Sequence, residues 1–335
     1  MKFSLIVCTY MRSEALIRLL ESVNRQTLYP DEILIIDASL NDETTLVLRK
    51  NPFQNLSYFM VFDENRGLTR QRNFGISKVA ETSEIVCFLD DDTVLEPDYF
   101  EQLLKTYIAY PEAFGVGGYI NNEIKWEYID QNYIAGPNDF CFDSWKRKDS
   151  SRLVLRKKLG LDSDCPPGIS PLFSHGRSVS FLPPTNKVYE VEMLMGGVSS
   201  FRKRVFDEFQ FSTYFEGYGL YEDADFSLRL AKKGKLYLNT AAQLKHYHEV
   251  SGRPDYYRYG KMVVRNGWYV WRIKNPNPVW KDTMKWHAIT LLLACIRFSN
   301  ALTTTNKKAA FREALGRFSG YGSLIFNKPQ INNES

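Results

Sequence analysis

Three consecutive aspartates, Asp90, Asp91 and Asp92, directly follow an apolar run over residues 85–89. Such a run predicts a buried strand, so the triplet falls at the end of that strand. Carboxylates this close repel one another, and burial makes their charge more costly. A bound divalent cation would relieve the repulsion, because Mg²⁺ and Mn²⁺ prefer carboxylate oxygens. The competing interpretation is an acidic turn that opens the next helix, since Asp is a good cap and Pro97 suits a first turn.

A second acidic group, Glu222 and Asp223 with Asp225, precedes a helical pattern that ends at Gly234. The charges of Glu222 and Asp225 would raise the pKa of Asp223, and a carboxylate with a raised pKa is a candidate general base. The competing interpretation is structural, because acidic residues favour the N-terminus of a helix.

Two histidines, His246 and His248, alternate after a strand-like segment. In an extended chain they point to opposite faces, so we do not expect them to bind one ion together. His175 lies in an irregular stretch, and the sequence assigns it no role.

The first half of the chain alternates apolar strands with helices. Strands are predicted over residues 3–8, 33–36, 56–62 and 85–89, and helices over residues 13–23, 68–79 and 97–110. Continuous apolar strands separated by helices indicate an α/β fold, with a mostly parallel sheet covered on both faces. Ligands bind beyond the carboxyl ends of such strands, where Thr9, Asp37 and the aspartate triplet all fall. For Asp37 alone, an Asx-type turn is the competing interpretation.

Residues 119–188 lack a clear period and are rich in Pro, Gly and aromatic residues, which indicates functional loops. The five cysteines form no CxxC pair, and Cys8 and Cys87 lie within strands, as in reduced cytosolic proteins. No signal peptide is visible, and the longest apolar run, residues 288–296, is far shorter than the ~20 residues of a spanning helix. We therefore expect a cytoplasmic protein, peripheral on the inner face of the membrane if it contacts one.

Charge is unevenly distributed along the chain. Residues 253–335 hold 14 Lys and Arg against 4 Asp and Glu, whereas residues 1–252 hold 29 against 35. The basic segment is also rich in Tyr and Trp, which fits either a helical surface at a membrane interface or a helical cap on the preceding domain. Nucleic-acid binding is not expected, because the body is acidic and no nucleic-acid module is present.

Six motifs in order over residues 3–252 resemble the family-2 glycosyltransferases, which are inverting enzymes with the GT-A nucleotide-sugar fold. Any one of these motifs is weak, but their order makes the resemblance specific. They are the first strand and nucleotide loop at residues 4–10, the acid Asp37 with Asn41 and Asp42, the helix with Asn65, Arg66, Gly67 and residues 72–75, the DxD motif Asp90–Asp92, the glycine segment at residues 196–202, and the ED segment at residues 221–226 with Arg229.

The resemblance implies a role for each matching residue. Asp223 would be the general base, with Glu222 as the second candidate. The residues implied for the donor nucleotide are Thr9, Tyr10, Asp37, Arg72, Asp90 and Asp91, and those for the acceptor are Gly196, Gly197 and Glu222. The implied ligands of a Mg²⁺ or Mn²⁺ ion are Asp92, Asp90 and His246. His248 would instead contact the donor diphosphate.

The resemblance also implies the overall organisation and activity. Residues 1–252 would form the catalytic domain, with a nucleotide-sugar half (1–118) and an acceptor half (119–252), and residues 253–335 a helical extension. The donor would be a UDP-sugar, with dTDP- and GDP-sugars as alternatives. The acceptor would be a saccharide, either free or linked to a lipid. The reaction would belong to the synthesis of surface polysaccharide or another glycan.

Two other functions would also use a nucleotide-binding α/β fold. A nucleotidyltransferase acting on sugar phosphates would carry a phosphate loop rich in Gly, Arg and Lys after the first strand, but residues 9–14 do not match one. A non-catalytic nucleotide-sugar binding protein would be expected to lose the acidic triplet or the ED pair, and both are present.

Overall fold

The computed structural model describes residues 1–215, 217–248 and 255–331. Its contacts divide the chain into two compact units. The described part of the first unit comprises residues 1–125 and 179–248, and that of the second comprises residues 126–178 and 255–331. The functional boundaries at residues 118 and 252 stay a prediction.

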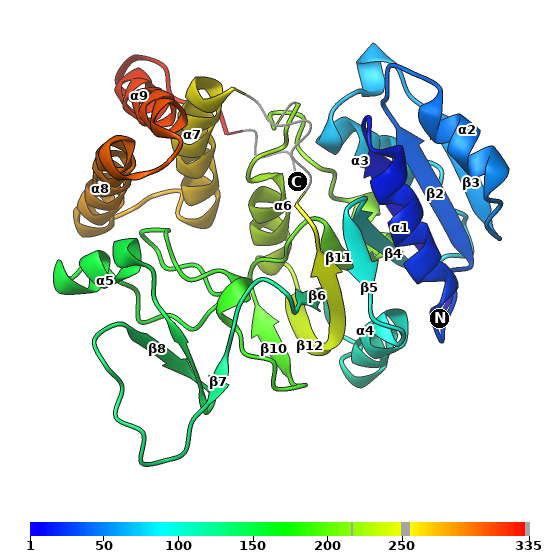
Figure 1. Cartoon of the computed structure of the whole chain (residues 1–335), viewed down its shortest axis with the longest axis horizontal. Coiled ribbons are helices and arrows are strands. Elements are labelled where there is room, and N and C mark those ends of the chain that lie inside the picture. The colour runs from blue at the N-terminus through cyan, green and yellow to red at the C-terminus, as the bar shows by residue number, and fades with distance from the viewer. Residues whose placement is uncertain (216, 249–254, 332–335) are drawn as a thin grey trace. The chain divides into compact units, whose positions relative to one another are not determined.

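The first unit is built on one large sheet, whose strand order is β10-β12-β6-β11-β4-β1-β2-β3, with β5 paired to β12 (Figure 1). The strands are β1 (Phe3–Thr9), β2 (Glu32–Asp37), β3 (Leu56–Met60), β4 (Ile85–Asp90), β5 (Thr93–Leu95), β6 (Ala113–Ile120), β10 (Val188–Val191), β11 (Val198–Arg202) and β12 (Lys235–His246). The helices and 3-10 turns of this unit are α1 (Ser13–Asn24), α2 (Glu43–Lys50), η1 (Asp63–Asn65), α3 (Leu68–Ile76), α4 (Tyr99–Ala109), η2 (Val179–Phe181), η3 (Lys203–Asp207) and α6 (Glu222–Ala231).

Strands β4, β1, β2 and β3 are parallel, as the continuous apolar runs predicted. Leu5 and Val7 share a buried cluster with Leu16 and Leu19 of α1. Ile6, which points to the other face, lies against Gly75 of α3. Because helices cover both faces, every residue of these strands can be apolar, which confirms the predicted α/β fold.

The other half of the sheet is mixed. Strand β11 runs antiparallel between β4 and β6, and β10 and β5 run antiparallel to β12. Strands β6 and β12 are parallel to each other. This half lies beyond the strands predicted from the sequence, and its strand β10 ends at Val191.

The register of the parallel strands places the predicted polar residues at one edge of the sheet. Thr9 pairs with Asp37, and Cys8 pairs with Asp90. Helix α6 begins at Glu222, directly after Tyr221 in the left-handed conformation, with φ of 71°.

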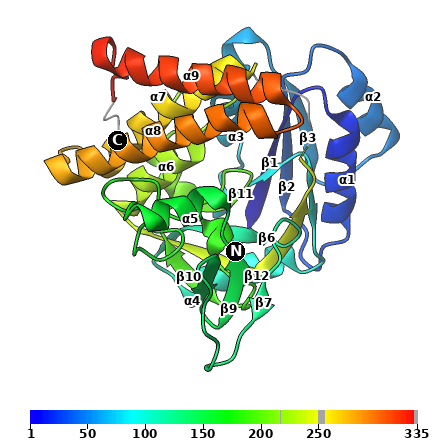
Figure 2. The same cartoon turned by 60° about the vertical axis from the view of Figure 1, so that its left-hand side comes forward.

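The second unit has its own small sheet, of strand order β7-β9-β8, and its own helices. The long helices α7, α8 and α9 pack together, with α8 and α9 side by side (Figure 2). The elements are β7 (Glu127–Tyr128), β8 (Asp139–Phe142), β9 (Trp145–Lys148), α5 (Ser151–Lys158), α7 (Tyr256–Lys274), α8 (Trp280–Thr303) and α9 (Lys307–Phe326).

Part of the stretch expected to be irregular is therefore ordered by β-pairing and ion pairs. Arg177 and Asp149 form a buried pair with an N–O distance of 2.7 Å. The core of the helices includes Trp271 and Trp286, whose stacked rings lie 5.0 Å apart. Burial lowers the pKa of His175 to about 3, and this ring contacts Thr290 at 3.3 Å, as a packed structural residue would. Among the described residues, no helix combines the length and the apolar character needed to cross a membrane.

Candidate active site

The aspartate triplet lies at the carboxyl edge of β4, and its middle member is bound into the protein. The Thr9 hydroxyl donates to Asp91 Oδ2 at 2.7 Å, and Arg12 Nη1 donates to Asp91 Oδ1 at 3.1 Å. Burial raises the pKa of Asp91 to about 7, although Arg12 and Thr9 oppose the rise. Asp91 is thus held by Thr9 and Arg12, and Arg12 Nη1 also lies 3.6 Å from Asp92 Oδ2.

Asp90, Asp92 and His246 come together at the ends of β4 and β12. One ligand atom from each lies within 4.8 Å of the other two. His246 Nε2 lies 3.1 Å from Asp92 Oδ1, and His246 Nδ1 lies 3.1 Å from Glu123 Oε1. Although burial lowers the pKa of His246, the hydrogen bonds to Asp92 and Glu123 raise it to about 10. The carboxylates thus favour a positive charge at this position.

This donor set fits a divalent metal ion. Two neighbouring ligands of an octahedral Mg²⁺ stand about 3 Å apart, and His246 Nε2 lies 3.1 Å from Asp92 Oδ1. Two carboxylates suit Mg²⁺ and Mn²⁺, and one imidazole is compatible with Mn²⁺. The three residues predicted as metal ligands therefore have the chemistry and the spacing for that role.

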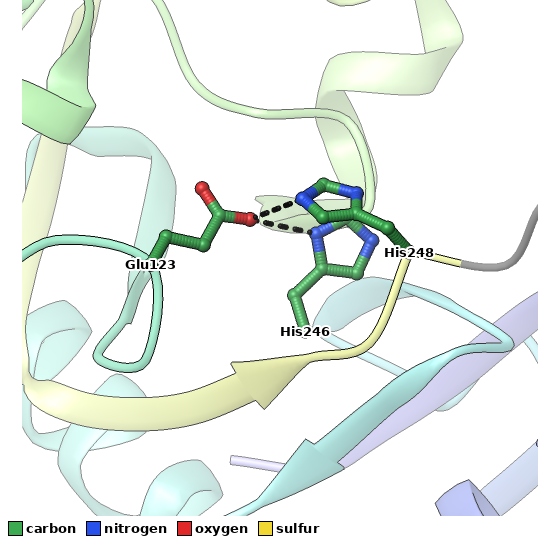
Figure 3. A group of neighbouring side chains, drawn as sticks. All are labelled: Glu123, His246 and His248. Atoms are coloured by element: carbon green, nitrogen blue, oxygen red, sulfur yellow. Dashed lines mark hydrogen bonds and ion pairs between the residues drawn. The ribbon is translucent and has the colours of Figure 1, made fainter. Parts of the chain in front are cut away.

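The expectation that His246 and His248 point apart is wrong. Their ring centroids lie 4.2 Å apart, and both rings contact Glu123 Oε1 (Figure 3). Strand β12 ends at His246, so the alternation of an extended chain does not continue to His248.

Arg72 of α3 forms a buried ion pair with Glu222 of α6. The second Arg72 nitrogen, Nη2, lies 3.8 Å from Asp90 Oδ1. Burial raises the pKa of Glu222, and Arg72 opposes that rise. Arg72 therefore links the triplet to the ED segment. Glu222 accepts the Arg72 hydrogen bond with Oε1, whereas its Oε2 is buried with no hydrogen-bond partner among the described residues.

Asp223 has a different environment from Glu222. Its Oδ1 accepts a hydrogen bond from the Ala224 N–H at 2.8 Å, and its Oδ2 accepts one from the Gly196 N–H at 3.3 Å. Burial raises the pKa of Asp223, and these two N–H groups oppose the rise. A carboxylate with a raised pKa, held by backbone groups, suits proton transfer.

Gly196 lies against the Glu222 carboxylate and Gly197 against the Asp90 carboxylate, so neither position has room for a side chain. A Cβ on Gly197 would stand 2.0 Å from Asp90 Cγ, and a Cβ on Gly196 would stand 2.4 Å from Glu222 Oε1. The Asp90 N–H also donates to the Gly197 carbonyl at 3.0 Å. The glycine pair thus brings the β4 edge and the start of α6 together.

Of the remaining predicted donor residues, Asp37 is fully buried. Its Oδ1 accepts from the Ser39 N–H at 2.8 Å, and its Oδ2 accepts from the Tyr58 hydroxyl at 2.9 Å. The bond from the Ser39 N–H is the Asx-type turn that was the alternative interpretation of Asp37. A nucleobase would therefore have to use the remaining lone pairs of the Asp37 carboxylate. Tyr10 is exposed beside Thr9.

Sequence reasoning missed two residues of this site, Arg12 and Glu123. Arg12 was readable as a basic residue in the loop after β1, on the same sheet edge as the triplet. Glu123 follows β6 in a stretch without periodicity, and the sequence carries no signal that connects it to β12 more than 100 residues later.

Comparisons with known proteins show the family and the fold of the chain. Residues 4–174 match the model of glycosyl transferase family 2, and the chain belongs to that family. A crystal structure of GalNAc-T7 with UDP, GalNAc and Mn²⁺ superposes with a TM-score of 0.50 at 16% sequence identity. The superposition covers 78% of this chain and 47% of that one, and it supports the GT-A fold.

Two curated relatives illustrate the family. A glucosyl-dolichyl phosphate glucuronosyltransferase from Haloferax volcanii is 36% identical over 122 residues. That match spans 35% of this chain and 38% of the relative. An O-antigen chain rhamnosyltransferase from Salmonella typhimurium is 23% identical over 261 residues, which span 77% of this chain and 70% of the relative.

Proposed function

We propose that the chain is a metal-dependent inverting glycosyltransferase that moves a sugar from a nucleoside-diphosphate sugar to a saccharide acceptor. The observation that carries the proposal is the placement of Asp90, Asp92 and His246 beside Asp223 and Glu222, joined by Arg72 and the glycine pair. Metal donors and a candidate base on neighbouring elements are what such a transfer needs. A UDP-sugar is the expected donor class, with dTDP- and GDP-sugars as alternatives.

On the donor side, Asp90, Asp92 and His246 would hold a Mg²⁺ or Mn²⁺ ion. When bound, the ion supplies positive charge that stabilises the leaving diphosphate. Thr9 and Arg12 hold Asp91 and so fix the loop that carries the two outer aspartates. Arg72 adds a buried positive charge near Asp90. The nucleoside would lie along the edge that carries Tyr10 and Asp37.

On the acceptor side, Asp223 would take the proton of the attacking hydroxyl. Its Oδ2 already binds the Gly196 N–H, so an acceptor sugar beside the glycine pair would meet this carboxylate. Glu222 is held by Arg72 and would orient the acceptor rather than take its proton. One base on the face opposite the leaving group gives inversion.

A surface on α8 and α9 supports contact with a membrane. Exposed apolar residues recur along α8 at helical spacing, at Trp280, Met284, Phe298 and Leu302. A similar stripe on α9 holds Phe311, Leu315, Phe318 and Ile325, and the Phe298 ring lies 5.8 Å from that of Phe311, so the stripes join. We call this surface the apolar face.

Basic residues lie beside the apolar face, with Lys281 at the start of α8 and Lys307 and Lys308 at the start of α9. Apolar area flanked by positive charge suits the interface of an anionic bilayer. A lipid-linked saccharide is therefore the acceptor class that we favour, and the dolichyl phosphate in the name of the Haloferax volcanii relative points in the same direction. We propose a peripheral placement, with the inner face of the membrane as the expected side.

The test is release of nucleoside diphosphate from a panel of UDP-, dTDP- and GDP-sugars, with Mn²⁺, Mg²⁺ or EDTA. Sugars carried by one of the three nucleotides should release nucleoside diphosphate only when metal is present, and the Asp92→Asn variant should not release it. Release at the same rate in EDTA would remove the metal from the mechanism. Formation of pyrophosphate from a nucleoside triphosphate and a sugar phosphate would instead identify a nucleotidyltransferase.

A further inference from the structure

A second group of metal-ligating side chains lies next to the Asp90–Asp92–His246 site. Glu123, just after β6, places Oε1 between two imidazoles, 3.1 Å from His246 Nδ1 and 2.9 Å from His248 Nε2 (Figure 3). One ligand atom from each of the three residues lies within 4.8 Å of the others. We call Glu123, His246 and His248 the outer triad, and Asp90, Asp92 and His246 the inner triad.

The donors of the outer triad suit a different metal from those of the inner triad. Two imidazoles and one carboxylate are a ligand set typical of Zn²⁺, with a fourth position left for water. Two ligands of a tetrahedral Zn²⁺ ion stand about 3.3 Å apart. The two oxygen–nitrogen distances around Glu123 Oε1 are close to that value, so little movement is needed to bind an ion.

The backbone around the outer triad is held in place by bonds that do not involve its own side chains. The His246 N–H donates to Asn122 Oδ1 at 2.9 Å, and Asn122 Nδ2 donates to the His246 carbonyl at 3.0 Å. The Tyr247 N–H donates to the Asp92 carbonyl at 3.0 Å. The side chains of Glu123 and His248 are 30% and 57% exposed, so an ion can reach them directly from solvent.

The two triads share one imidazole. A neutral imidazole has one nitrogen that can bind a metal and one N–H. If His246 Nε2 binds an ion beside Asp92, the proton on Nδ1 is donated to Glu123. If Nδ1 binds an ion beside Glu123, the proton on Nε2 is donated to Asp92. Neutral His246 therefore serves one triad at a time.

We propose that Glu123, His246 and His248 form a binding site for a transition-metal ion of the Zn²⁺ type, and that an ion there withdraws His246 from the inner triad. The first half of the proposal concerns a site outside the proposed reaction. The second half rests on the proposed function, because it makes the outer ion an inhibitor of metal binding at the inner triad.

The first experiment measures Zn²⁺ binding by the full chain in competition with a chromogenic chelator. The Asp90→Asn/Asp92→Asn variant loses the inner carboxylates but should keep one Zn²⁺. Adding His248→Ala should weaken that binding by at least about tenfold, since a ligand is lost. The matched control adds His287→Ala, which removes a histidine of α8 and should leave Zn²⁺ binding unchanged.

Equal Zn²⁺ affinity with and without His248 would overturn the site. Melting temperatures of all variants identify any that fail to fold, and Glu123→Gln in place of His248→Ala then supplies an independent loss of one ligand. No turnover is measured, so this result does not depend on whether the chain transfers a sugar.

The second experiment measures Mn²⁺ binding to the wild-type chain with and without Zn²⁺. Zn²⁺ should weaken Mn²⁺ binding, and His248→Ala should relieve that effect. Equal competition in His248→Ala would mean that Zn²⁺ enters the inner triad, which contradicts the shared-imidazole account. If the wild type bound no Mn²⁺, the proposed function would lose its metal while the Zn²⁺ binding experiment would still decide the outer site.

Discussion

Arg72 of α3 and Glu222 of α6 form a buried ion pair across 150 residues of sequence. Arg72 also lies 3.8 Å from Asp90, so one guanidinium joins the strand end that carries the proposed metal ligands to the helix that carries the candidate base. Arg72 therefore has a structural role as well as the donor-binding role predicted from the family resemblance.

Replacing Arg72 with Met should destabilise the fold, because it leaves Glu222 buried without its partner. Loss of one partner of a buried pair typically costs about 3–5 kcal/mol. The free energy of unfolding in urea measures this. The double variant Arg72→Met/Glu222→Gln should recover part of the loss, since no charged carboxylate then lacks a cation. If the two single changes were simply additive, the pair would not be an energetic unit.

Gly197→Ala should weaken Mn²⁺ binding by at least about tenfold, or about 1.4 kcal/mol, because the new Cβ would collide with the Asp90 carboxylate. Calorimetric titration with Mn²⁺ measures the affinity. Gly267→Ala is the matched control, since a Cβ at that helical position meets nothing within 4 Å. Unchanged Mn²⁺ affinity in Gly197→Ala would show that Asp90 is not a ligand at its observed position.

Asp223→Asn should reduce kcat about 10²–10⁴-fold while donor affinity stays the same, because only proton transfer is lost. Burial raises the pKa of Asp223, and the base works when it is deprotonated. As the pH falls, kcat/KM of the wild type should therefore decline at a higher pH than an ordinary Asp, whose pKa is about 3.9, would give.

The rate–pH profile of Glu222→Gln separates the two candidate bases. If Asp223 is the base, Glu222→Gln keeps the acidic decline and changes mainly the KM for the acceptor. A decline that disappeared in Glu222→Gln and persisted in Asp223→Asn would assign the base to Glu222 instead.

Binding to anionic vesicles should depend on the apolar face. The triple variant Trp280→Ser/Met284→Ser/Leu302→Ser changes side chains that are 60–78% exposed, so the fold should be unaffected while co-sedimentation with phosphatidylglycerol vesicles falls. Binding to the vesicles should also weaken at high salt. Each nearby basic residue contributes about 1 kcal/mol of electrostatic attraction to the anionic surface, and salt screens that attraction.

The matched control for the apolar face is Leu40→Ser/Phe62→Ser/Ile134→Ser, which removes three comparably exposed apolar side chains from elsewhere. This control should sediment like the wild type. Equal loss in both triple variants, or no binding by the wild type, would reject the apolar face as a membrane contact.

The parallel half of the sheet could be predicted because its strands are buried on both faces. Residues 3–8 and 85–89 are continuously apolar, and that pattern has one common structural explanation. The antiparallel half was harder to predict from the sequence. Strand β11 is held by contacts of Gly, Ser and Arg residues, among them the bond from Arg202 to the Ala113 carbonyl, and such contacts leave no continuous apolar run. The small sheet of the second unit depends on tertiary ion pairs such as Arg177–Asp149 that carry no periodicity.

The inner triad was predictable because two of its members adjoin a strand end and the family resemblance supplied His246. The outer triad was not. Predicting it required knowing that β12 ends at His246 and that Asn122 binds the backbone there, and both are set by tertiary contacts. Alternation in an extended chain gave the wrong orientation for His248 for the same reason.

The most direct test of the central claim is calorimetric titration of the chain with UDP, dTDP and GDP, in Mn²⁺ and in EDTA. The account predicts that one of these diphosphates binds at least about tenfold more tightly with Mn²⁺, and that Asp92→Asn removes this gain. Equal affinity in Mn²⁺ and EDTA, or a full gain in Asp92→Asn, would contradict a metal and diphosphate site at the carboxyl edge of β4.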